Sequence, residues 1–326
     1  MKIVSLFSGA GAMDLGFINQ GFEIVWANDF EKAQCETYRN NIGDHIFHGD
    51  ITSVGLDDIP DCDGIIGGSP CQGFSNANRQ TNFLDNPKNM LVKEYIRIVK
   101  GKKPRFFILE NVPRLLTAGE GKFLNEIIKE LDDYHIEIKV LNAADYGAAQ
   151  KRKRAILIGS REGIIKHPEA THREHTTVGG CLNGIHNELP NQLDITKTNE
   201  IVLKRMMHVP QGGNWSSVPK EYWMPSWGNK THSNIHKRLS LDEPSVTLAN
   251  FRKSYITHPT ENRILSVREA ARIQGFPDDF IFYGGLSDKQ QMVSNAVPVQ
   301  MSEAIAKVVK IHIETENNKQ KELVYT

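Results

Sequence analysis

The sequence predicts an α/β fold: a doubly wound, mostly parallel sheet with a second, small and irregular domain. Over the first 171 residues, short apolar strands alternate with segments of helical periodicity, as in βαβ units. The first strand leads into a glycine-rich turn and then a helix, which is typical of nucleotide-binding sheets. From about residue 172 the periodic segments disappear, and turns, Trp, Asn, His and basic residues become frequent.

Length and composition exclude several classes of protein. The 326 residues suffice for one large or two modest domains, and 39 basic residues balance 39 acidic ones. Net charge therefore indicates no partner, and a nucleic-acid surface would need local clustering. The cysteines, Cys35, Cys62, Cys71 and Cys181, have no metal-ligand spacing, so we expect reduced thiols and no metal. Without a membrane-length apolar run or a signal-peptide layout, we expect a cytoplasmic protein.

The first predicted strand, residues 2–7, runs into Ser8-Gly9-Ala10-Gly11 and then a helix. Glycines let backbone N–H groups approach a ligand, and a helix N-terminus favours anionic groups. The third glycine of a dinucleotide fingerprint is missing, because Asp14 stands there. Cofactor binding and simple turn chemistry are equally good explanations of this turn alone.

Acidic residues follow the next two predicted strands. Residues 22–27 end in Asn28-Asp29-Phe30, and residues 45–47 end in Gly49-Asp50-Ile51. Doubly wound folds hold ribose hydroxyls with an acid at such a place, and Asp50 would accept a bond from an adenine amino group. Capping of a helix and of a turn are the alternatives. Together, the three strand ends predict a nucleoside site.

A fourth predicted strand, residues 64–66, ends in the segment 67–75, which contains Pro70-Cys71-Gln72. A cysteine just past the carboxyl end of a strand lies where open α/β sheets bind ligands. An activated thiolate nucleophile is the functional interpretation, and a small buried side chain is the alternative. The polar loop that follows, residues 76–86, would close over a substrate.

Further along, residues 91–100 and 123–131 have helical spacing, whereas 104–109 and 136–141 read as strands. Glu110 directly follows the predicted strand 104–109, so we expect it near Cys71 at the same sheet edge. A capping or ion-paired acid is the alternative. Alternation predicts Gln150, Arg152 and Arg154 on one side of a strand through Ile158. Such a row would meet phosphates or a carboxylate, unless it is a solvated basic edge.

The irregular region carries local positive charge. Residues 201–272 contain eleven basic and five acidic side chains, an excess of six. This favours a phosphate-facing lobe, with an irregular domain lacking a partner as the alternative. Ser266 and Glu269 form a capping-box pattern that starts a helix, which Gly275 ends. The last amphipathic helix follows Val297-Pro298 and is expected to end near Ile313.

With these motifs in hand, the chain resembles the DNA (cytosine-5) methyltransferases, in particular the compact bacterial restriction-modification type, over nearly its whole length. Phe7-Ser8-Gly9-Ala10-Gly11 resembles the cofactor loop of that family, and Pro70-Cys71-Gln72 its nucleophile motif. Glu110-Asn111-Val112 and the QxRxR spacing of residues 150–154 match two further motifs. Residues 268–277 resemble the segment that braces the recognition domain, and Thr247-Leu248 the pair that ends the variable region. Ser69, Lys88 and Ser294 depart from the usual Pro, Arg and Gly.

The resemblance implies a class I S-adenosylmethionine-dependent methyltransferase fold and roles for individual residues. Catalytic residues would be Cys71, Glu110, Arg152 and Arg154, with Arg152 beside the thiolate. S-adenosyl-L-methionine would contact Phe7, Ser8, Gly9, Ala10, Gly11, Asp29, Phe30, Asp50, Ile51, Pro70, Asn295 and Ala296. DNA would contact Gln72, Ser75, Arg79, Lys237, Arg238, Thr247, Arg252 and Lys253.

The implied organisation is a catalytic and cofactor-binding domain, 1–171, a target-recognition domain, 172–282, and a C-terminal segment, 283–326, that returns to the first. We expect a monomer that methylates C5 of a flipped-out cytosine in double-stranded DNA. We expect no association with a membrane. Two other hypotheses stay open: an RNA-directed cytosine methyltransferase, and a catalytically silent DNA-binding protein. The sequence leaves open the DNA target and whether a cognate restriction endonuclease, acting separately, exists.

Overall fold

The structure, a computed structural model, describes residues 1–69 and 89–324. The chain divides into two compact units. Unit 1 comprises Met1–Asn142, Lys153–Ala170 and Gln300–Thr326, and unit 2 comprises Ala143–Arg152 and Thr171–Val299. Residues 143–152 and 283–299, which the sequence analysis grouped with the catalytic segments, thus cluster with unit 2. The functional assignment of the three predicted segments stays a prediction.

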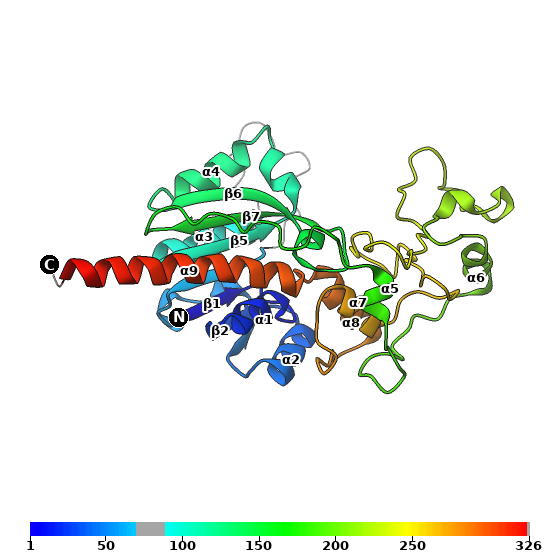
Figure 1. The fold of residues 1–326 in the computed structure, drawn as a ribbon, viewed down its shortest axis with the longest axis horizontal. Coiled ribbons are helices and arrows are strands. Elements are labelled where there is room, and N and C mark those ends of the chain that lie inside the picture. Colours follow the sequence, from blue (N-terminus) through cyan, green and yellow to red (C-terminus); the bar gives the residue numbers. More distant parts are fainter. Residues whose placement is uncertain (70–88, 325–326) are drawn as a thin grey trace. The chain divides into compact units, whose positions relative to one another are not determined.

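A seven-stranded sheet forms the centre of unit 1, in the order β3-β2-β1-β4-β5-β7-β6 (Figure 1). Its strands are β1 (Lys2–Leu6), β2 (Glu23–Asp29), β3 (Ile46–His48), β4 (Gly64–Gly67), β5 (Phe106–Asn111), β6 (His135–Asn142) and β7 (Lys153–Ser160). The first five pair in parallel, and β7 runs antiparallel to both of its neighbours. The predicted doubly wound, mostly parallel sheet is confirmed, and the carboxyl ends of β1, β2, β4 and β5 share one edge.

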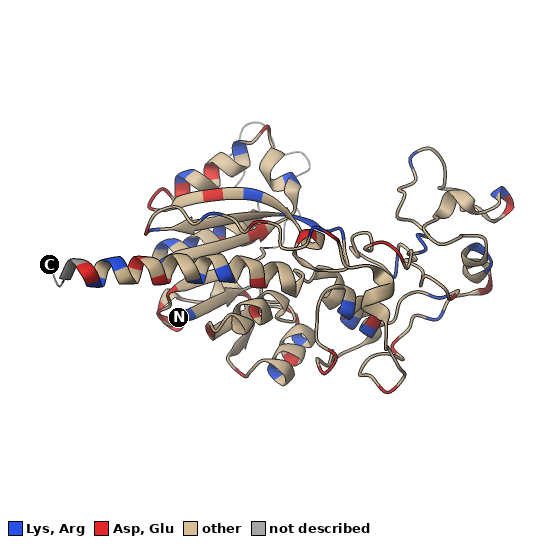
Figure 2. Cartoon of the chain, viewed as in Figure 1, with Lys and Arg blue, Asp and Glu red and all other residues tan. Residues whose placement is uncertain are grey.

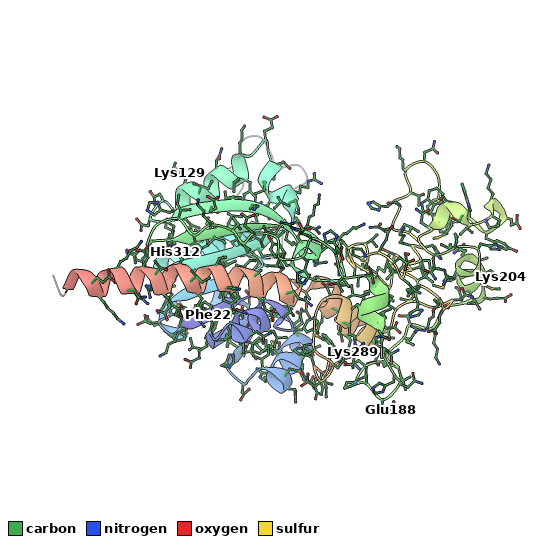
Figure 3. All side chains as sticks on the ribbon, in the orientation of Figure 1. Phe22, Lys129, Glu188, Lys204, Lys289 and His312 are labelled. Carbon is green, nitrogen blue, oxygen red and sulfur yellow. The ribbon has the colours of Figure 1, made fainter. Side chains whose placement is uncertain are left out.

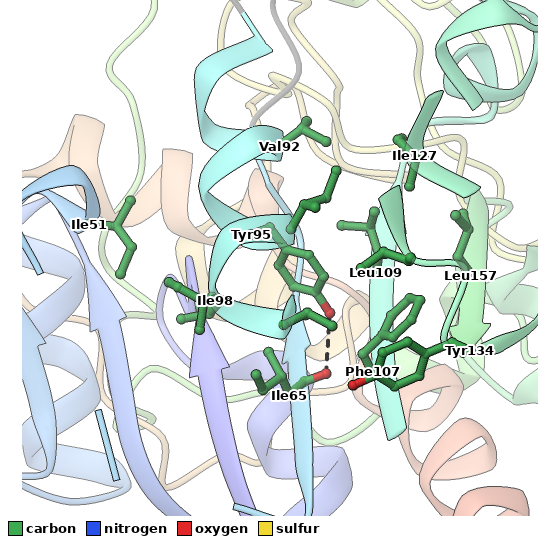
Figure 4. Close-up of a cluster of buried hydrophobic side chains, with 14 of the residues drawn as sticks. Ile51, Ile65, Val92, Tyr95, Ile98, Phe107, Leu109, Ile127, Tyr134 and Leu157 are labelled. Atoms are coloured by element: carbon green, nitrogen blue, oxygen red, sulfur yellow. Dashed lines mark hydrogen bonds between the residues drawn. The ribbon is translucent and has the colours of Figure 1, made fainter. Parts of the chain in front are cut away.

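Helices of unit 1 cover both faces of this sheet. They are α1 (Ala12–Asn19), α2 (Lys32–Asn41), α3 (Met90–Lys102), α4 (Lys122–Glu130) and most of α9 (Val299–Val324). α3 and α4 pack on one face, over alternate strand residues such as Ile65, Phe107 and Leu157 (Figure 4). There the buried Tyr95 hydroxyl donates to the carbonyls of Ile65 (3.2 Å) and Ile108 (2.8 Å), which fixes α3 over β4 and β5.

The opposite face packs against α1 and α9. Phe22, labelled in Figure 3, makes edge contacts with Phe17 of α1 and Phe106 of β5, at ring separations of 5.2 and 6.2 Å. Gly16 lets the two helices approach closely, since a Cβ there would lie 2.4 Å from Cβ of Ser302. α1, which follows the glycine-rich segment, is therefore packed closely against α9.

Two sequence predictions need correction. β7 begins at Lys153, so Gln150 and Arg152 precede the strand, because β6 ends at Asn142, the partner of Lys153. Gln150 instead forms an isolated bridge with Ser245, and its side-chain oxygen accepts from the Leu248 amide (3.3 Å). α9 continues to Val324 rather than ending near Ile313, and an ion pair between Glu316 and Lys319 supports its last turns.

Unit 2 contains α5 (Val178–Leu182), α6 (Glu200–Met207), α7 (Val267–Ile273) and α8 (Leu286–Asn295). In the described part of this unit, isolated bridges replace regular strands. The predicted capping box at α7 is confirmed: the Ser266 hydroxyl accepts from the Glu269 amide (3.0 Å), and the Glu269 carboxylate accepts from the Ser266 amide (2.8 Å). Lys and Arg are spread over several helices and loops of the unit (Figure 2), and Lys204 projects from α6 (Figure 3).

None of the helices within residues 1–69 and 89–324 combines the length and the apolar character that crossing a membrane requires.

Candidate active site

The glycine-rich turn of residues 7–11, which the sequence analysis predicts to bind a cofactor, connects β1 to α1 and is hydrogen-bonded to the end of β2. Phe7, Gly9 and Gly11 have φ of 56°, 58° and 87°, so the turn needs glycine at two of its positions. The Ser8 amide donates to the Asn28 carbonyl (2.9 Å), and the Gly9 amide donates to Oδ2 of Asp29 (2.9 Å). β1 and β2 pair in parallel, which brings the predicted glycine turn and the predicted ribose acid together.

Asp29 is 8% exposed, and its Oδ1 accepts from the Glu31 amide (2.9 Å). Burial raises the pKa of this carboxyl. Glu31, not Asp29, is the N-cap of α2, so simple helix capping does not explain this acid. The next residue, Phe30, is 66% exposed and offers an aromatic surface at the same strand end.

Asp50 is exposed and caps the short 3₁₀ helix Ile51–Ser53 by accepting from the Thr52 amide (2.9 Å). The capping alternative is therefore observed here, and it leaves the second carboxylate oxygen at the surface. Asn28 joins the neighbouring strand ends, because its side-chain amide donates to the carbonyls of Gly49 (2.9 Å) and Phe47 (3.2 Å). Sequence reasoning assigned no role to Asn28; the available signal was an amide directly before the predicted ribose acid, Asp29.

At the ends of β4 and β5, Gly68, which precedes the predicted nucleophile motif, lies against Glu110. A Cβ on Gly68 would meet Oε2 of Glu110 at 2.6 Å. The Asn111 side-chain amide donates to the Ser69 carbonyl (3.0 Å), and its oxygen accepts from the Val112 amide (2.9 Å). Five predicted site residues lie outside the described residues: Pro70, Cys71, Gln72, Ser75 and Arg79. Lys88, one of the three departures from the family pattern, also lies outside them.

Glu110 has Arg154 as its ion-pair partner. Nε of Arg154 lies 2.7 Å from Oε1 of Glu110, and the side chains are 13% and 12% exposed respectively. Glu110 pairs with Ile156 in the β5–β7 ladder, so Arg154 is the diagonal neighbour on the same face. This pair holds the carboxyl group at the end of β5 and realises the ion-paired alternative. The predicted position beside Cys71 stays a prediction, because Cys71 lies outside the described residues.

Arg152 braces a backbone segment within unit 2. It is 2% exposed, and its Nη2 donates to the carbonyls of Ser294 (2.9 Å) and Asn295 (3.3 Å). Ser294 belongs to α8 and is not among the residues with positive φ. Serine in place of the usual glycine therefore causes no backbone strain at that position. Ala296, the C-cap of α8, follows directly.

The predicted DNA-contacting residues of unit 2 fall into two groups. Lys253 is exposed, Arg252, Lys237 and Thr247 are partly exposed, and the Thr247 hydroxyl donates to the Lys151 carbonyl (2.8 Å). Arg238 is only 5% exposed. Its three guanidinium nitrogens donate to Val209, Met206, His258 and Glu261 carbonyls and to the Asn262 side chain. These bonds use all five donors, which argues against Arg238 as a DNA contact.

Comparisons with known proteins agree with this arrangement. The family of C-5 cytosine-specific DNA methylases matches residues 1–311. The type II methyltransferase M.NgoFVII of Neisseria gonorrhoeae is 38% identical over 325 residues, covering 94% of this chain and 86% of the relative. M1.HphI of Haemophilus parahaemolyticus, also a type II methyltransferase, is 38% identical over 327 residues, covering 95% and 86%.

A solved structure described as a prophage-encoded DNA modification methyltransferase from E. coli shares the fold, with a TM-score of 0.76 and 24% identity. It covers 96% of this chain and 99% of that one. The family match extends over almost the entire chain and includes the strand ends described above. The chain therefore belongs to the C-5 cytosine-specific DNA methylases and is a DNA (cytosine-5-)-methyltransferase of the type II restriction-modification class.

Proposed function

We propose that this enzyme transfers a methyl group from S-adenosylmethionine to C5 of a flipped-out cytosine within a specific sequence of duplex DNA, through a covalent bond between Cys71 and C6. The observation that carries the proposal is the contact between Glu110 and Gly68. It brings a carboxyl group, fixed by Arg154, to the point where the chain enters the Cys71 segment. Nucleophilic addition to a cytosine ring requires a thiol and an acidic side chain that contacts the ring, and both would lie at one sheet edge.

The residues at the first three strand ends fit the proposed cofactor. Asp29 directs a buried carboxylate toward the turn, Phe30 presents an exposed ring, and Asp50 has an oxygen at the surface. Carboxylates accept hydrogen bonds from ribose hydroxyls and an adenine amino group, and the ring supplies a stacking face. S-adenosylmethionine supplies a methyl group on a sulfonium, which is electrophilic.

The reaction we propose begins with the thiolate of Cys71. A cysteine thiol has a pKa of about 8.5 in water, so it needs a cationic or dipolar setting to react at neutral pH. Addition of the sulfur to C6 moves the C5–C6 electron pair to C5, which then takes the methyl group. Loss of the C5 proton restores the double bond and expels the thiolate.

Glu110 would act on the ring at N3, holding a proton there as negative charge develops. Arg154 would orient Glu110 through the 2.7 Å ion pair, and Asn111 would position the entry to the Cys71 segment. Arg152 would hold Ser294 and Asn295 in place, and Asn295 is one of the predicted cofactor contacts. The remaining proposed cofactor contacts are Phe7, Ser8, Gly9, Ala10, Gly11, Ile51, Pro70 and Ala296.

For DNA, we propose contacts from Lys237, Thr247, Arg252 and Lys253 of unit 2 and from Gln72, Ser75 and Arg79. Basic side chains would neutralise phosphates, and polar ones would reach base edges after flipping has opened the duplex. The type II relatives support DNA over RNA as the substrate and an active enzyme over a silent binding protein. Protection of the host genome beside a separate endonuclease, by a monomer in the cytoplasm, is the role we propose.

Methyl transfer and covalent addition can be tested separately. Incubation with methyl-tritiated S-adenosylmethionine and genomic DNA should place label in 5-methylcytosine, and bisulfite sequencing of the product would give the target. Duplex DNA carrying 5-fluorocytosine at that target should trap the protein, because fluorine at C5 cannot leave as a proton. Cys71→Ser should abolish both, whereas Cys62→Ser should abolish neither. A Cys71→Ser enzyme with full activity, or label in RNA alone, would refute the proposal.

A further inference from the structure

Asp14 is a buried acid beside the cofactor turn to which neither the motifs nor the proposed reaction gives a role. It lies in the first turn of α1 and is 0% exposed. Within residues 1–69 and 89–324 it takes part in no ion pair, so no cation offsets its charge. Two hydroxyl groups donate to its carboxylate: Ser5 to Oδ1 (2.7 Å) and Tyr38 to Oδ2 (2.7 Å). Two hydroxyl donors directed at one carboxylate suit its ionised form, which can only accept hydrogen bonds.

These bonds continue into the cofactor turn. The Ser8 hydroxyl lies 3.0 Å from Oγ of Ser5 and 3.1 Å from the Ser5 carbonyl, so it donates toward the residue that Asp14 holds. The Ser8 carbonyl in turn accepts from the Gly11 amide (2.9 Å). The Asp14 carboxylate is thus linked through two serines to the backbone that carries Gly9 and Gly11.

On its other side, Asp14 fixes the ring that packs on the turn. The Tyr38 hydroxyl contacts Nε2 of His45 (3.1 Å) as well as Asp14. A Cβ on Gly11 would lie 3.0 Å from the Tyr38 ring and 2.1 Å from a methyl group of Ile42. Gly11 therefore sits directly on Tyr38, and a movement of Tyr38 would reach the turn.

An unpaired buried carboxylate is costly, and burial raises the pKa of Asp14 to about 6, although Ser5 and Tyr38 oppose the shift. A neutral amide of the same shape would avoid this cost. It would also place an N–H group against one of two hydroxyls that now donate, which forces that hydroxyl to reverse. The charge is what makes both hydroxyl donors point inward and orders the chain from Tyr38 to Ser8.

We propose that Asp14 is a positioning residue for S-adenosylmethionine: its carboxylate holds the turn 7–11 in binding geometry through Ser5 and Ser8 on one side and Tyr38 on the other. The inference rests on the proposed role of this turn in binding the cofactor. It predicts that Asp14 affects cofactor affinity much more than the rate of methyl transfer once the cofactor is bound.

The effect of Asp14 on the pH dependence of cofactor binding must be distinguished from that of other titratable groups nearby. Tyr38 and, beyond it, His45 face it from α2 and the segment before β3, and burial lowers the pKa of His45. Asp29 at the end of β2 is tied to the same turn through Gly9, whereas on α9 Glu303 contacts Asn19 at the exposed end of α1. Asp29 and His45 are retained in an Asp14 variant, so titration that they cause persists there.

The test is the affinity of the full-length enzyme for S-adenosylmethionine, measured by calorimetry between pH 5 and 8 in wild type, Asp14→Asn and Tyr38→Phe. Two matched controls are Asp57→Asn, at an exposed acid, and Tyr134→Phe, which removes a buried hydroxyl bond to the Pro104 carbonyl (2.9 Å). At pH 8 we expect Asp14→Asn to weaken binding about tenfold, with kcat at saturating cofactor changed less than about twofold. Both controls should bind as wild type does.

The pH profile distinguishes positioning from a purely structural role. Wild-type affinity should fall as pH drops through about 6, and Asp14→Asn should show a smaller fall, limited to the part that Asp29 and His45 cause. Tyr38→Phe should move it to higher pH, because the carboxylate loses a donor that favours its charged form. Asp14→Asn with wild-type affinity and pH profile, whatever its melting temperature, would overturn the inference. A wild-type enzyme that fails to bind the cofactor would instead refute the proposed function.

Discussion

Nε of Arg154 lies 2.7 Å from Oε1 of Glu110, and both side chains are almost removed from solvent. The antiparallel pairing of β5 with β7 makes them diagonal neighbours at the end of the sheet where the Cys71 segment begins. β7, the last strand along the chain, thus supplies the partner of the proposed ring-binding acid.

Removing that partner should damage catalysis more than cofactor binding. Arg154→Ala leaves the Glu110 carboxylate buried without its cation, and breaking such a pair costs about 3–5 kcal/mol in fully buried cases. We expect kcat to fall at least tenfold while the Kd for S-adenosylmethionine changes little. Arg154→Lys should recover part of the rate. Steady-state kinetics and calorimetry measure both quantities, and an Arg154→Ala enzyme with wild-type kcat would contradict the assignment.

Gly68 should tolerate no side chain. Its added Cβ would meet Oε2 of Glu110 at 2.6 Å, so Gly68→Ala must displace the carboxyl group. A displacement of this size in a reacting group lowers turnover by about a hundredfold. As a control, Gly180→Ala in α5 would make only an ordinary 3.4 Å contact with Thr177 and should leave activity unchanged. Equal methyl-transfer rates for the two variants would show that Glu110 does not need its present position.

Two basic residues of unit 2 should behave differently on mutation. Arg238→Ala removes a buried guanidinium with five backbone or side-chain acceptors and should lower the melting temperature by several degrees. The exposed Lys253 should instead contribute to DNA binding through a phosphate. Lys253→Ala should reduce the slope of log K against log salt by about 1 and leave stability unchanged. A stable Arg238→Ala protein with a reduced salt slope would reverse this distinction.

Asp14 should also make stability depend on pH in an unusual direction. Its pKa is raised in the folded state to about 6 from 3.8, so the folded form binds the proton more tightly than the unfolded chain does. The stabilisation from this proton is complete below pH 3.8 and is lost as pH rises through about 6. Relative to Asp14→Asn, wild type should lose about 3 kcal/mol of unfolding free energy over that window. Urea melts at several pH values measure the difference, and a constant difference would contradict the burial of this charge.

The order of motifs predicted much of the fold because it depends on short-range chemistry. The glycine turn after β1, the acid at the end of β2, the acid after β3, and the capping box of Ser266 and Glu269 are local patterns, and the structure contains each of them. Parallel strands then bring their carboxyl ends to one edge without further information. The prediction that Gln150 and Arg152 lie in a strand was wrong because β6 ends at Asn142, the partner of Lys153. The sequence of β7 alone does not reveal where its partner strand ends.

By itself, then, the sequence determined the alternating α/β core, the family and the residue types at the proposed cofactor site. Only the tertiary structure decided which partner each charged side chain takes. Arg238 and Lys253 are both basic residues in the same variable region, yet one is enclosed by carbonyl groups and the other faces solvent. Burial and register depend on segments far apart in the chain, and the free energy of a charge depends on both, so residue type alone does not fix its role.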